Sequence, residues 1–454
     1  MIAILFLLLL IVLGVVLMLT GGAPSLGITE LIIISGVFVV FFLSGIYVAA
    51  ALGMLGLLAD LAFSSRPTHP FIGEVAWNAS KNFLLVAIPL FLLMGEILLR
   101  SGLSDRLYRA LNVWFGRWPG GLLHTNIVSC AVFSAVSGSS PATAATIGSV
   151  ALPYFAKTGY NPRLVLGSLA AGGALGNLIP PGISLIVYGL FTETSVGQLY
   201  AASFVAGGLV TALFVAYIFA YSLVRGEREV APPPMPWPQR LASLVDLLPT
   251  ATLILMVLGT IYLGVATPTE SAALGVTGAL LLALLDRRLT FQMVHASVRA
   301  TARTTSMIGL IVLGAFVLNY VLTSLRLPQM LAGMVSGLPY PPWAIMGIII
   351  LFYIALGTFM ESLSMMITTL PVVFPVVMAF GYDAIWFGVV MTMLIEIAMI
   401  SPPDGMVMYV LQGMRKPPGP ITDVFVGVLP FLGLYVLGVG IVWAFPGCIL
   451  WVIR

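Results

Sequence analysis

The segment NLIPPGISLIVYG at residues 177–189 decides the fold, together with ISPPDGMVMYVLQG at residues 400–413. Each places two consecutive prolines inside an apolar run long enough to cross a membrane. Proline lacks the N–H that continues a helix, so each pair frees carbonyl groups to meet a cation and N–H groups to meet an anion. A simple kink is the alternative. Because Pro180-Pro181 and Pro402-Pro403 lie 222 residues apart, the sequence predicts two broken helices at equivalent positions.

Other short motifs recur at the same spacing. They are Ala50–Gly53 with Ala272–Gly275, Pro153 with Pro375, and Gly159-Tyr160 with Gly381-Tyr382. An ungapped set of this kind predicts an internal duplication. Each copy would hold five crossings and one hairpin, and an odd number of crossings inverts the second copy relative to the first.

The composition excludes a water-soluble protein. Hydrophobic residues make up 60% of the 454 residues and charged residues 8%, which no soluble domain could carry on its surface. The two cysteines and three histidines have no spacing typical of a disulfide framework or a transition-metal site. No basic cluster interleaved with aromatic residues points to nucleic acid. The fold class predicted is an all-α polytopic membrane protein in a lipid bilayer.

Apolar runs predict about eleven transmembrane helices, at 2–20, 29–45, 47–63, 82–101, 160–190, 196–224, 247–266, 270–286, 306–324, 383–413 and 424–446. Two further apolar segments, 121–157 and 343–380, are interrupted midway by small or polar residues. Each arm of about 15 residues would be roughly 22 Å long as a helix, short of the ~30 Å hydrocarbon core. Both segments are predicted to be re-entrant hairpins whose tips line a wet cavity.

The chain is therefore expected to divide into four parts. These are an extra N-terminal transmembrane helix (1–26), a first repeat (28–224) with its hairpin (121–157) and broken helix (160–190), a cytoplasmic proline-rich linker (225–246), and a second, inverted repeat (247–454) with its hairpin (343–380) and broken helix (383–413).

The distribution of basic residues predicts the orientation. With the N-terminus in the cytoplasm, fifteen of the 19 Lys and Arg residues fall inside, and only Arg66, Lys81, Arg326 and Arg454 fall outside. Cytoplasmic loops carry such an excess, so the C-terminus is expected on the outer side. Arginines beside apolar residues also predict interfacial helices at 103–118 and 289–303.

Hydroxyl groups gather at the expected tip of the first hairpin. Ser137, Ser139 and Ser140 flank the flexible Gly138, and Thr143 follows at helical spacing. Oxygen ligands of this kind suit Na⁺, and small residues also let helices pack closely. The serines are interpreted as contacts of an ion or a substrate.

Carboxylates mark the second half. The expected tip carries Thr358, Glu361, Ser362 and Ser364, and the second break carries Ser401 and Asp404. An ionisable residue inside a membrane is a functional candidate by default. Two readings stay open for Glu361 and Glu396, which could act at a site or hold the structure by hydrogen bonds. Asn177 could equally coordinate a cation or join two helices.

Six stretches carry a resemblance to a known family: VAIPLFLLMGEILLRSGLSDRL (86–107), SAVSGSSPATAATIGSVALP (134–153), NLIPPGISLIVYG (177–189), ATPTESAALG (266–275), LGTFMESLSMMITTLPVVFP (356–375) and ISPPDGMVMYVLQG (400–413). Together they resemble the large membrane (M) subunit of tripartite ATP-independent periplasmic (TRAP) transporters, from about residue 28 to the end. The resemblance implies an elevator-type carrier of the ion-transporter superfamily, with a scaffold domain and a transport domain.

The resemblance also implies the ligands and partners. Transport would be driven by two or more Na⁺ ions and would need no other cofactor. The partners would be a small four-helix TRAP membrane subunit and a periplasmic substrate-binding protein that delivers a small organic acid, in a bacterial cell inner membrane. The implied site residues are a first sodium site (Ser137, Gly138, Ser139, Ser140, Asn177, Gly182), a second sodium site (Thr358, Glu361, Ser401, Pro402, Gly405) and a substrate region (Ser140, Thr143, Pro180, Pro181, Ser362, Pro403, Asp404).

Three departures from the family pattern matter. Residues 1–26 precede the usual start, so the extra helix could contact or replace part of the small subunit. Gly182 stands where serine is usual, and Asp404 stands where an apolar residue is usual. A carboxylate repels an acidic substrate unless a cation or proton neutralises it, which favours a substrate that carries a positive group.

The function predicted is Na⁺-coupled uptake of a small organic acid or zwitterion. One alternative is a standalone ion-coupled organic anion carrier that needs no binding protein, and a weaker one is a membrane scaffold that does not transport. An enzyme is not expected, because the sequence offers no nucleophile paired with a base on facing helices.

Overall fold

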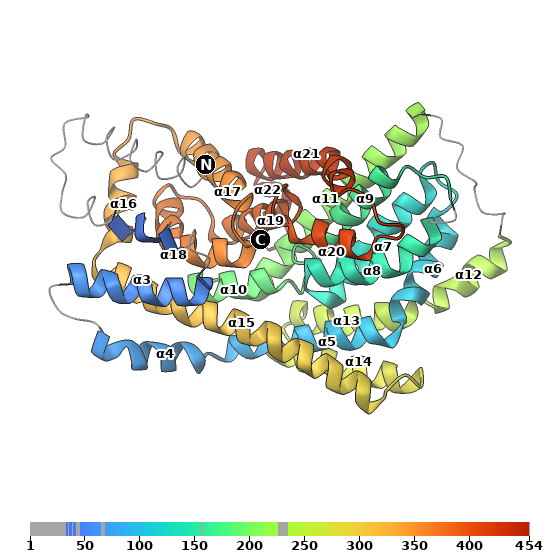
Figure 1. Ribbon diagram of the computed structural model, residues 1–454, viewed down its shortest axis with the longest axis horizontal. Coiled ribbons are helices and arrows are strands. Elements are labelled where there is room, and N and C mark those ends of the chain that lie inside the picture. The colour runs from blue at the N-terminus through green and yellow to red at the C-terminus, as the bar shows by residue number, and fades with distance from the viewer. Residues whose placement is uncertain are drawn as a thin grey trace. The chain divides into compact units, whose positions relative to one another are not determined.

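All regular elements in the described part of the chain are helices. The structure, a computed structural model, describes residues 33–34, 36–38, 40–41, 46–64, 69–155, 158–225 and 235–453, and no strand occurs among them. The helix predicted at 1–26, most of the crossing at 29–45, and residues 226–234 of the linker lie outside these ranges. The all-α class is confirmed (Figure 1).

The chain forms two compact units, and each unit takes residues from both predicted repeats. Unit 1 comprises Met1–Asn82, Thr304–Met346 and Met366–Tyr382, and unit 2 comprises Phe83–Arg303, Gly347–Met365 and Asp383–Arg454. The division between the units therefore does not follow the division between the repeats.

Unit 1 holds α3 (Val48–Phe63), η1 (His69–Phe71), α4 (Ile72–Ser80), α16 (Leu327–Ser336) and parts of three helices shared with unit 2, namely α15 (Phe291–Ser324), α17 (Pro342–Gly357) and α18 (Ser362–Ala379). In this unit α3 packs closely on α15. A side chain at Gly56 would press on the backbone of Leu318, so the absence of a Cβ sets how near these two helices can lie.

Unit 2 holds η2 (Phe83–Val86), α5 (Ala87–Ser101), α6 (Leu103–Phe115), α7 (Gly121–Ser137), α8 (Ser140–Phe155), α9 (Pro162–Gly173), α10 (Ile183–Thr192), α11 (Val196–Arg225), α12 (Trp237–Val245), α13 (Leu248–Tyr262), α14 (Pro268–Leu285), α19 (Ala384–Ile400), α20 (Met406–Met414), α21 (Thr422–Ala444) and α22 (Gly447–Leu450).

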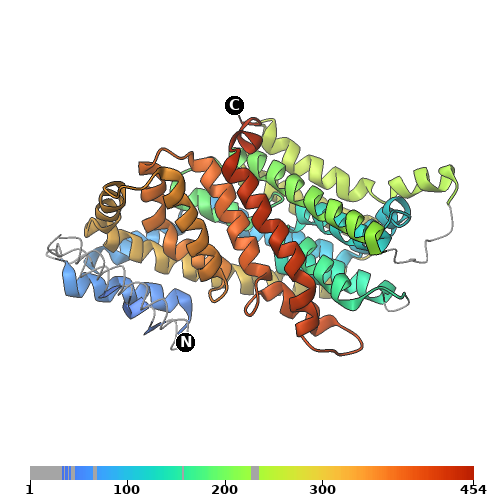
Figure 2. The same cartoon turned by 90° about the horizontal axis from the view of Figure 1, so that it is seen from above.

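One tightly packed helix pair of unit 2 joins the two predicted repeats. Helix α21, the long red helix of Figure 2, packs on α9. A Cβ at Gly427 would strike the carbonyl of Arg163, and a Cβ at Gly167 would strike the carbonyl of Gly427, so the two backbones are in direct contact. Asp423 adds ion pairs at 2.9 Å to Arg163 and to Arg415, which follows α20.

Within the described part of the chain, six helices are long and apolar enough to cross a membrane. They span Phe83–Ser101, Val196–Val224, Pro268–Leu285, Phe291–Ser324, Ser362–Ala379 and Thr422–Ala444, and α12 with α13 would add a seventh, bent by 47°. Shorter apolar helices, such as α7 and α19, fall below that length. The count of eleven crossings and the inversion of the repeats stay predictions.

The two stretches expected to lie at the interface differ. Residues 103–115 form the separate helix α6, whose Leu103, Leu107 and Leu111 are buried. Residues 291–303 instead continue into the crossing as one helix of 34 residues, α15. No glycine or proline lies between Phe291 and Ile308, so nothing in the sequence ends the helix there.

Candidate functional site

The first predicted hairpin tip is a tight turn between α7 and α8. Helix α7 ends at Ser137, Gly138 takes a left-handed conformation with φ of 62°, and α8 begins at Ser140. Glycine is the residue that adopts this conformation without strain. The hydroxyl groups of Ser137 and Thr143 lie 2.5 Å apart across the turn, and both residues are buried, whereas Ser139 is half-buried.

The first break packs against this tip. Helix α9 ends at Gly173 and α10 begins at Ile183, two residues after Pro181, with a cis peptide bond between the two prolines. The amide of Ile183 donates to the carbonyl of Gly138 at 3.4 Å. A Cβ at Gly138 would strike the carbonyl of Pro181, and one at Gly182 would strike that of Asn177. Both glycines are therefore required by close backbone contact.

Three buried side chains join the tip and the break to the second half of the chain. The hydroxyl of Ser140 donates to Oε2 of Glu396 at 2.7 Å. It accepts from the main-chain N–H of Asn177 at 3.2 Å and from the side-chain amide at 3.1 Å. Glu396 lies on α19 and is fully buried. This network, Ser140–Asn177–Glu396, connects α8, the first break and α19.

The second predicted tip is shaped by Glu361. This residue precedes α18, and its carboxylate accepts from the N–H groups of Leu363 at 3.1 Å and Ser364 at 2.7 Å, and from the Ser364 hydroxyl at 2.6 Å. It thereby satisfies backbone donors at the helix N-terminus. Ser362 is buried behind it, and the hydroxyl of Thr358 donates to the carbonyl of Ala355 at 2.7 Å.

The second break is shorter and more open than the first. Helix α19 ends at Ile400 and α20 begins at Met406, with Ser401 and Gly405 buried and Asp404 exposed. Pro402 is half-buried, and exposed Pro403 accepts a hydrogen bond at 2.7 Å from the hydroxyl of Tyr409. The first break, by contrast, is buried throughout residues 174–182.

The second tip lies beside the second break. A Cβ at Gly357 would strike the side chain of Ala398, near the end of α19. The carboxyl groups of Glu361 and Asp404 are near enough to repel each other. No hydrogen bond within the described ranges joins the Glu361 carboxylate to residues 401–405.

The donor atoms suit a hard monovalent cation better than a transition metal. No group of three or more His, Cys, Asp or Glu residues converges in the part of the chain that the structure describes. Hydroxyl and carbonyl oxygens gather instead at the first tip and first break, and Oε1 of buried Glu396 has no hydrogen-bond donor among the described residues. Oxygen atoms of this kind are ligands for Na⁺.

From the sequence alone, Glu396 could belong to a binding site or have a structural role. It lies 256 residues from Ser140 along the chain, so no local motif links them. The available signal was a carboxylate in an apolar helix five residues before a proline break, which is a functional candidate.

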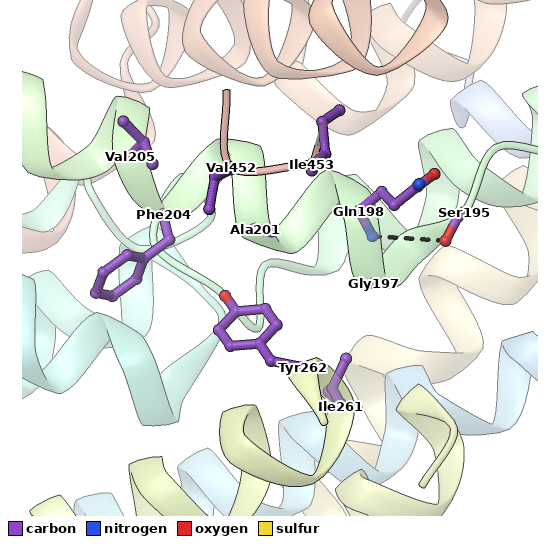
Figure 3. A pocket seen from close by; sticks show the side chains of 10 residues that line it. All are labelled: Ser195, Gly197, Gln198, Ala201, Phe204, Val205, Ile261, Tyr262, Val452 and Ile453. Atoms are coloured by element: carbon purple, nitrogen blue, oxygen red, sulfur yellow. Dashed lines mark hydrogen bonds between the residues drawn. The ribbon is translucent and has the colours of Figure 1, made fainter. Parts of the chain in front are cut away.

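A separate cavity of about 470 Å³ contains none of the predicted site residues (Figure 3). It is lined mostly by apolar side chains, among them Phe204, Ile261 and Val452, and one weak hydrogen bond of 3.5 Å joins the Gln198 amide to the Ser195 hydroxyl. This chemistry offers no charge to bind an ion or an organic acid.

Comparison with known proteins places the chain in a family. The model of the DctM component of tripartite ATP-independent periplasmic transporters matches residues 35–448. The C4-dicarboxylate TRAP transporter large permease protein DctM of Pseudomonas aeruginosa is 33% identical over 369 residues, or 81% of this chain and 86% of the relative. The ectoine/5-hydroxyectoine TRAP transporter large permease protein UehC of Ruegeria pomeroyi is 28% identical, over 86% of this chain and 90% of the relative.

A solved structure supports the fold alone. The YdaH transporter of Alcanivorax borkumensis matches with a TM-score of 0.59 at 16% sequence identity, over 90% of this chain and 97% of that one. The resemblance inferred from the sequence motifs is confirmed by the family match over residues 35–448. The chain is a multi-pass membrane transport protein rather than an enzyme, and it belongs to the large permease (DctM component) family of TRAP transporters.

Proposed function

We propose that this permease carries out Na⁺-coupled uptake across a bacterial inner membrane, with its N-terminus in the cytoplasm and its C-terminus in the periplasm. A periplasmic substrate-binding protein would deliver the substrate, and a small four-helix membrane subunit would complete the complex. The family match carries the proposal, and the hydroxyl and carboxylate oxygens at the first tip and first break support Na⁺ as the coupling ion.

The proposed mechanism is an elevator movement of one body that contains the site. Both tips and both breaks belong to unit 2. Within this unit, the contact of α9 with α21 and the network Ser140–Asn177–Glu396 join the first half of the chain to the second. These links favour the two halves of the site moving together.

The proposed substrate is a small organic acid, or a zwitterion that also carries a positive group. Relatives are named for C4-dicarboxylates and for ectoines. Exposed Asp404 beside Glu361 puts negative charge at the second break. A cationic group on the substrate would offset that charge, so this pair of carboxylates favours the zwitterion.

Replacement of Na⁺ by choline is expected to abolish uptake. Proteoliposomes would contain the permease and small subunit, with the loaded binding protein outside and an inward Na⁺ gradient, and accumulation of radiolabelled substrate would be measured. Equal uptake in choline would refute Na⁺ coupling. Uptake of free substrate at full rate without the binding protein would instead support a standalone carrier.

A substitution of Glu361 can distinguish its helix-capping role from a role in binding a cation. Asparagine caps a helix about as well as the best residues, whereas alanine costs about 1 kcal/mol. We therefore expect Glu361→Asn to keep the melting temperature within a few degrees but to raise the Na⁺ concentration for half-maximal uptake at least tenfold, because it removes the charge. Glu361→Ala is the control for loss of the cap. An unchanged Na⁺ requirement in folded Glu361→Asn would leave Glu361 with the capping role only.

A further inference from the structure

Glu396 is a buried carboxylate with an unused oxygen. It lies on α19, five residues before Ser401, and its exposed fraction is 0%. Oε2 accepts the hydrogen bond from the Ser140 hydroxyl at 2.7 Å. Oε1 has no hydrogen-bond partner among the residues that the structure describes, although it is also buried.

No basic side chain compensates this charge. The ion pairs of the described chain engage Asp60, Glu96, Asp286 and Asp423, and none engages Glu396. Its neighbours on α19, Ile395 and Ile397, are fully buried and apolar. Burial of an unpaired carboxylate costs several kcal/mol, so such a group normally has a cationic partner. The Ser140 hydroxyl and the N–H groups of Asn177 offer hydrogen bonds to Glu396 but no positive charge, and a bound cation would supply that charge.

Ser140 is better suited to orient this carboxylate than to bind the cation. A hydroxyl has one donor and two acceptor positions. The donor goes to Glu396, and both acceptor positions go to the N–H groups of Asn177. The main-chain and side-chain N–H groups of Asn177 also face the Glu396 carboxylate. Within this buried network Glu396 Oε1 is the oxygen that stays available for a cation.

We propose that Glu396 is a direct ligand of a bound Na⁺ ion through its unpartnered Oε1. The inference rests on the proposed Na⁺ coupling and deepens it: the first cation site takes its charge from the second half, and Ser140 is a positioning residue. The bound ion neutralises the buried carboxylate at the contact of α19 with the first break.

The test measures Na⁺ binding without transport. The permease, purified in detergent with its small subunit, is melted at increasing NaCl with choline chloride holding the ionic strength constant. Wild type is expected to gain thermal stability with Na⁺. Glu396→Gln keeps an acceptor for the Ser140 hydroxyl but removes the charge, and we expect its half-saturating Na⁺ concentration to rise at least tenfold. Glu96→Gln is the matched control, because its partner Arg100 lies one helical turn away at 3.0 Å.

The outcomes are separable. A Glu396→Gln protein with the wild-type Na⁺ response would overturn the inference and leave Na⁺ coupling standing, whereas a wild type with no Na⁺ response would count against the proposed function itself. If Glu396→Gln does not fold, Glu396→Asp decides, because it keeps the charge but withdraws the oxygens by one methylene group. We expect its half-saturating Na⁺ concentration to rise at least tenfold, and an unchanged value would also overturn the inference.

Discussion

Gly427→Ala is expected to leave little folded permease. A Cβ at this position would strike the carbonyl group of Arg163, so α21 would have to withdraw from α9. Two further contacts depend on the same approach, the ion pair of Asp423 with Arg163 and the hydrogen bond from the Tyr435 hydroxyl to the carbonyl of Ala174 at 3.1 Å. Overpacking alone costs about 1–3 kcal/mol, and loss of the linked contacts brings the expected cost to about 3–5 kcal/mol.

Gly433→Ala is the matched control, because the same change is made on the same helix. No atom lies within 4 Å of a Cβ at Gly433, and alanine favours a helix over glycine by about 0.5–1 kcal/mol. We expect this variant to melt at or slightly above the wild-type temperature by fluorescence-detected size exclusion, and Gly427→Ala to melt at least 10 °C lower or to aggregate. Equal melting of the two variants would contradict the direct backbone contact of α9 with α21.

Gly138→Ala is expected to reduce uptake by at least a hundredfold. The left-handed conformation, with φ of 62°, costs a residue with a side chain about 1–2 kcal/mol. The Cβ would also strike the carbonyl of Pro181 and push the first tip away from the first break. Displacement of the tip would separate Ser140 from Asn177, so the loss should appear in transport as well as in stability.

Gly264→Ala isolates the conformational cost. Gly264 has a similar φ of 69°, but no atom lies within 4 Å of a Cβ there. We expect this variant to lose only about 1–2 kcal/mol of stability and to transport at close to the wild-type rate. Substrate uptake at equal amounts of membrane-inserted protein measures the difference. Similar transport by both alanine variants would show that the contact of Gly138 with Pro181 is not needed.

The proline pairs show how much of the site the sequence alone could predict. Helix α10 begins two residues after Pro181, and α19 ends two residues before Pro402, because a proline pair cannot continue the hydrogen bonds of a helix. The local turn at Gly138 is predictable for a similar reason, since serine and glycine favour a helix end. These features depend on residues that are adjacent along the chain, so the sequence alone can predict them.

Glu396 shows what the sequence could not predict. Its hydrogen bond to Ser140 spans 256 residues, and neither periodicity nor charge distribution reports such a pair. The double role open to Glu361 was also undecidable, because capping depends on the path of the backbone after residue 361. The continuous helix α15 was missed for a different reason. The arginines in 289–303 are typical of a separate helix at the membrane interface, yet no glycine or proline there ends the helix.

The contact between α9 and α21 has a consequence for how the protein is made. Arg163 and its partner Asp423 are 260 residues apart, so the ribosome must synthesise more than half of the chain before α9 meets its partner. Until then the surface of α9 around Gly167, which contacts Gly427 in the folded protein, lacks its partner helix. Assembly of the core therefore waits for the last long helix to be inserted, and a nascent chain halted before α21 would be a natural substrate for membrane quality control.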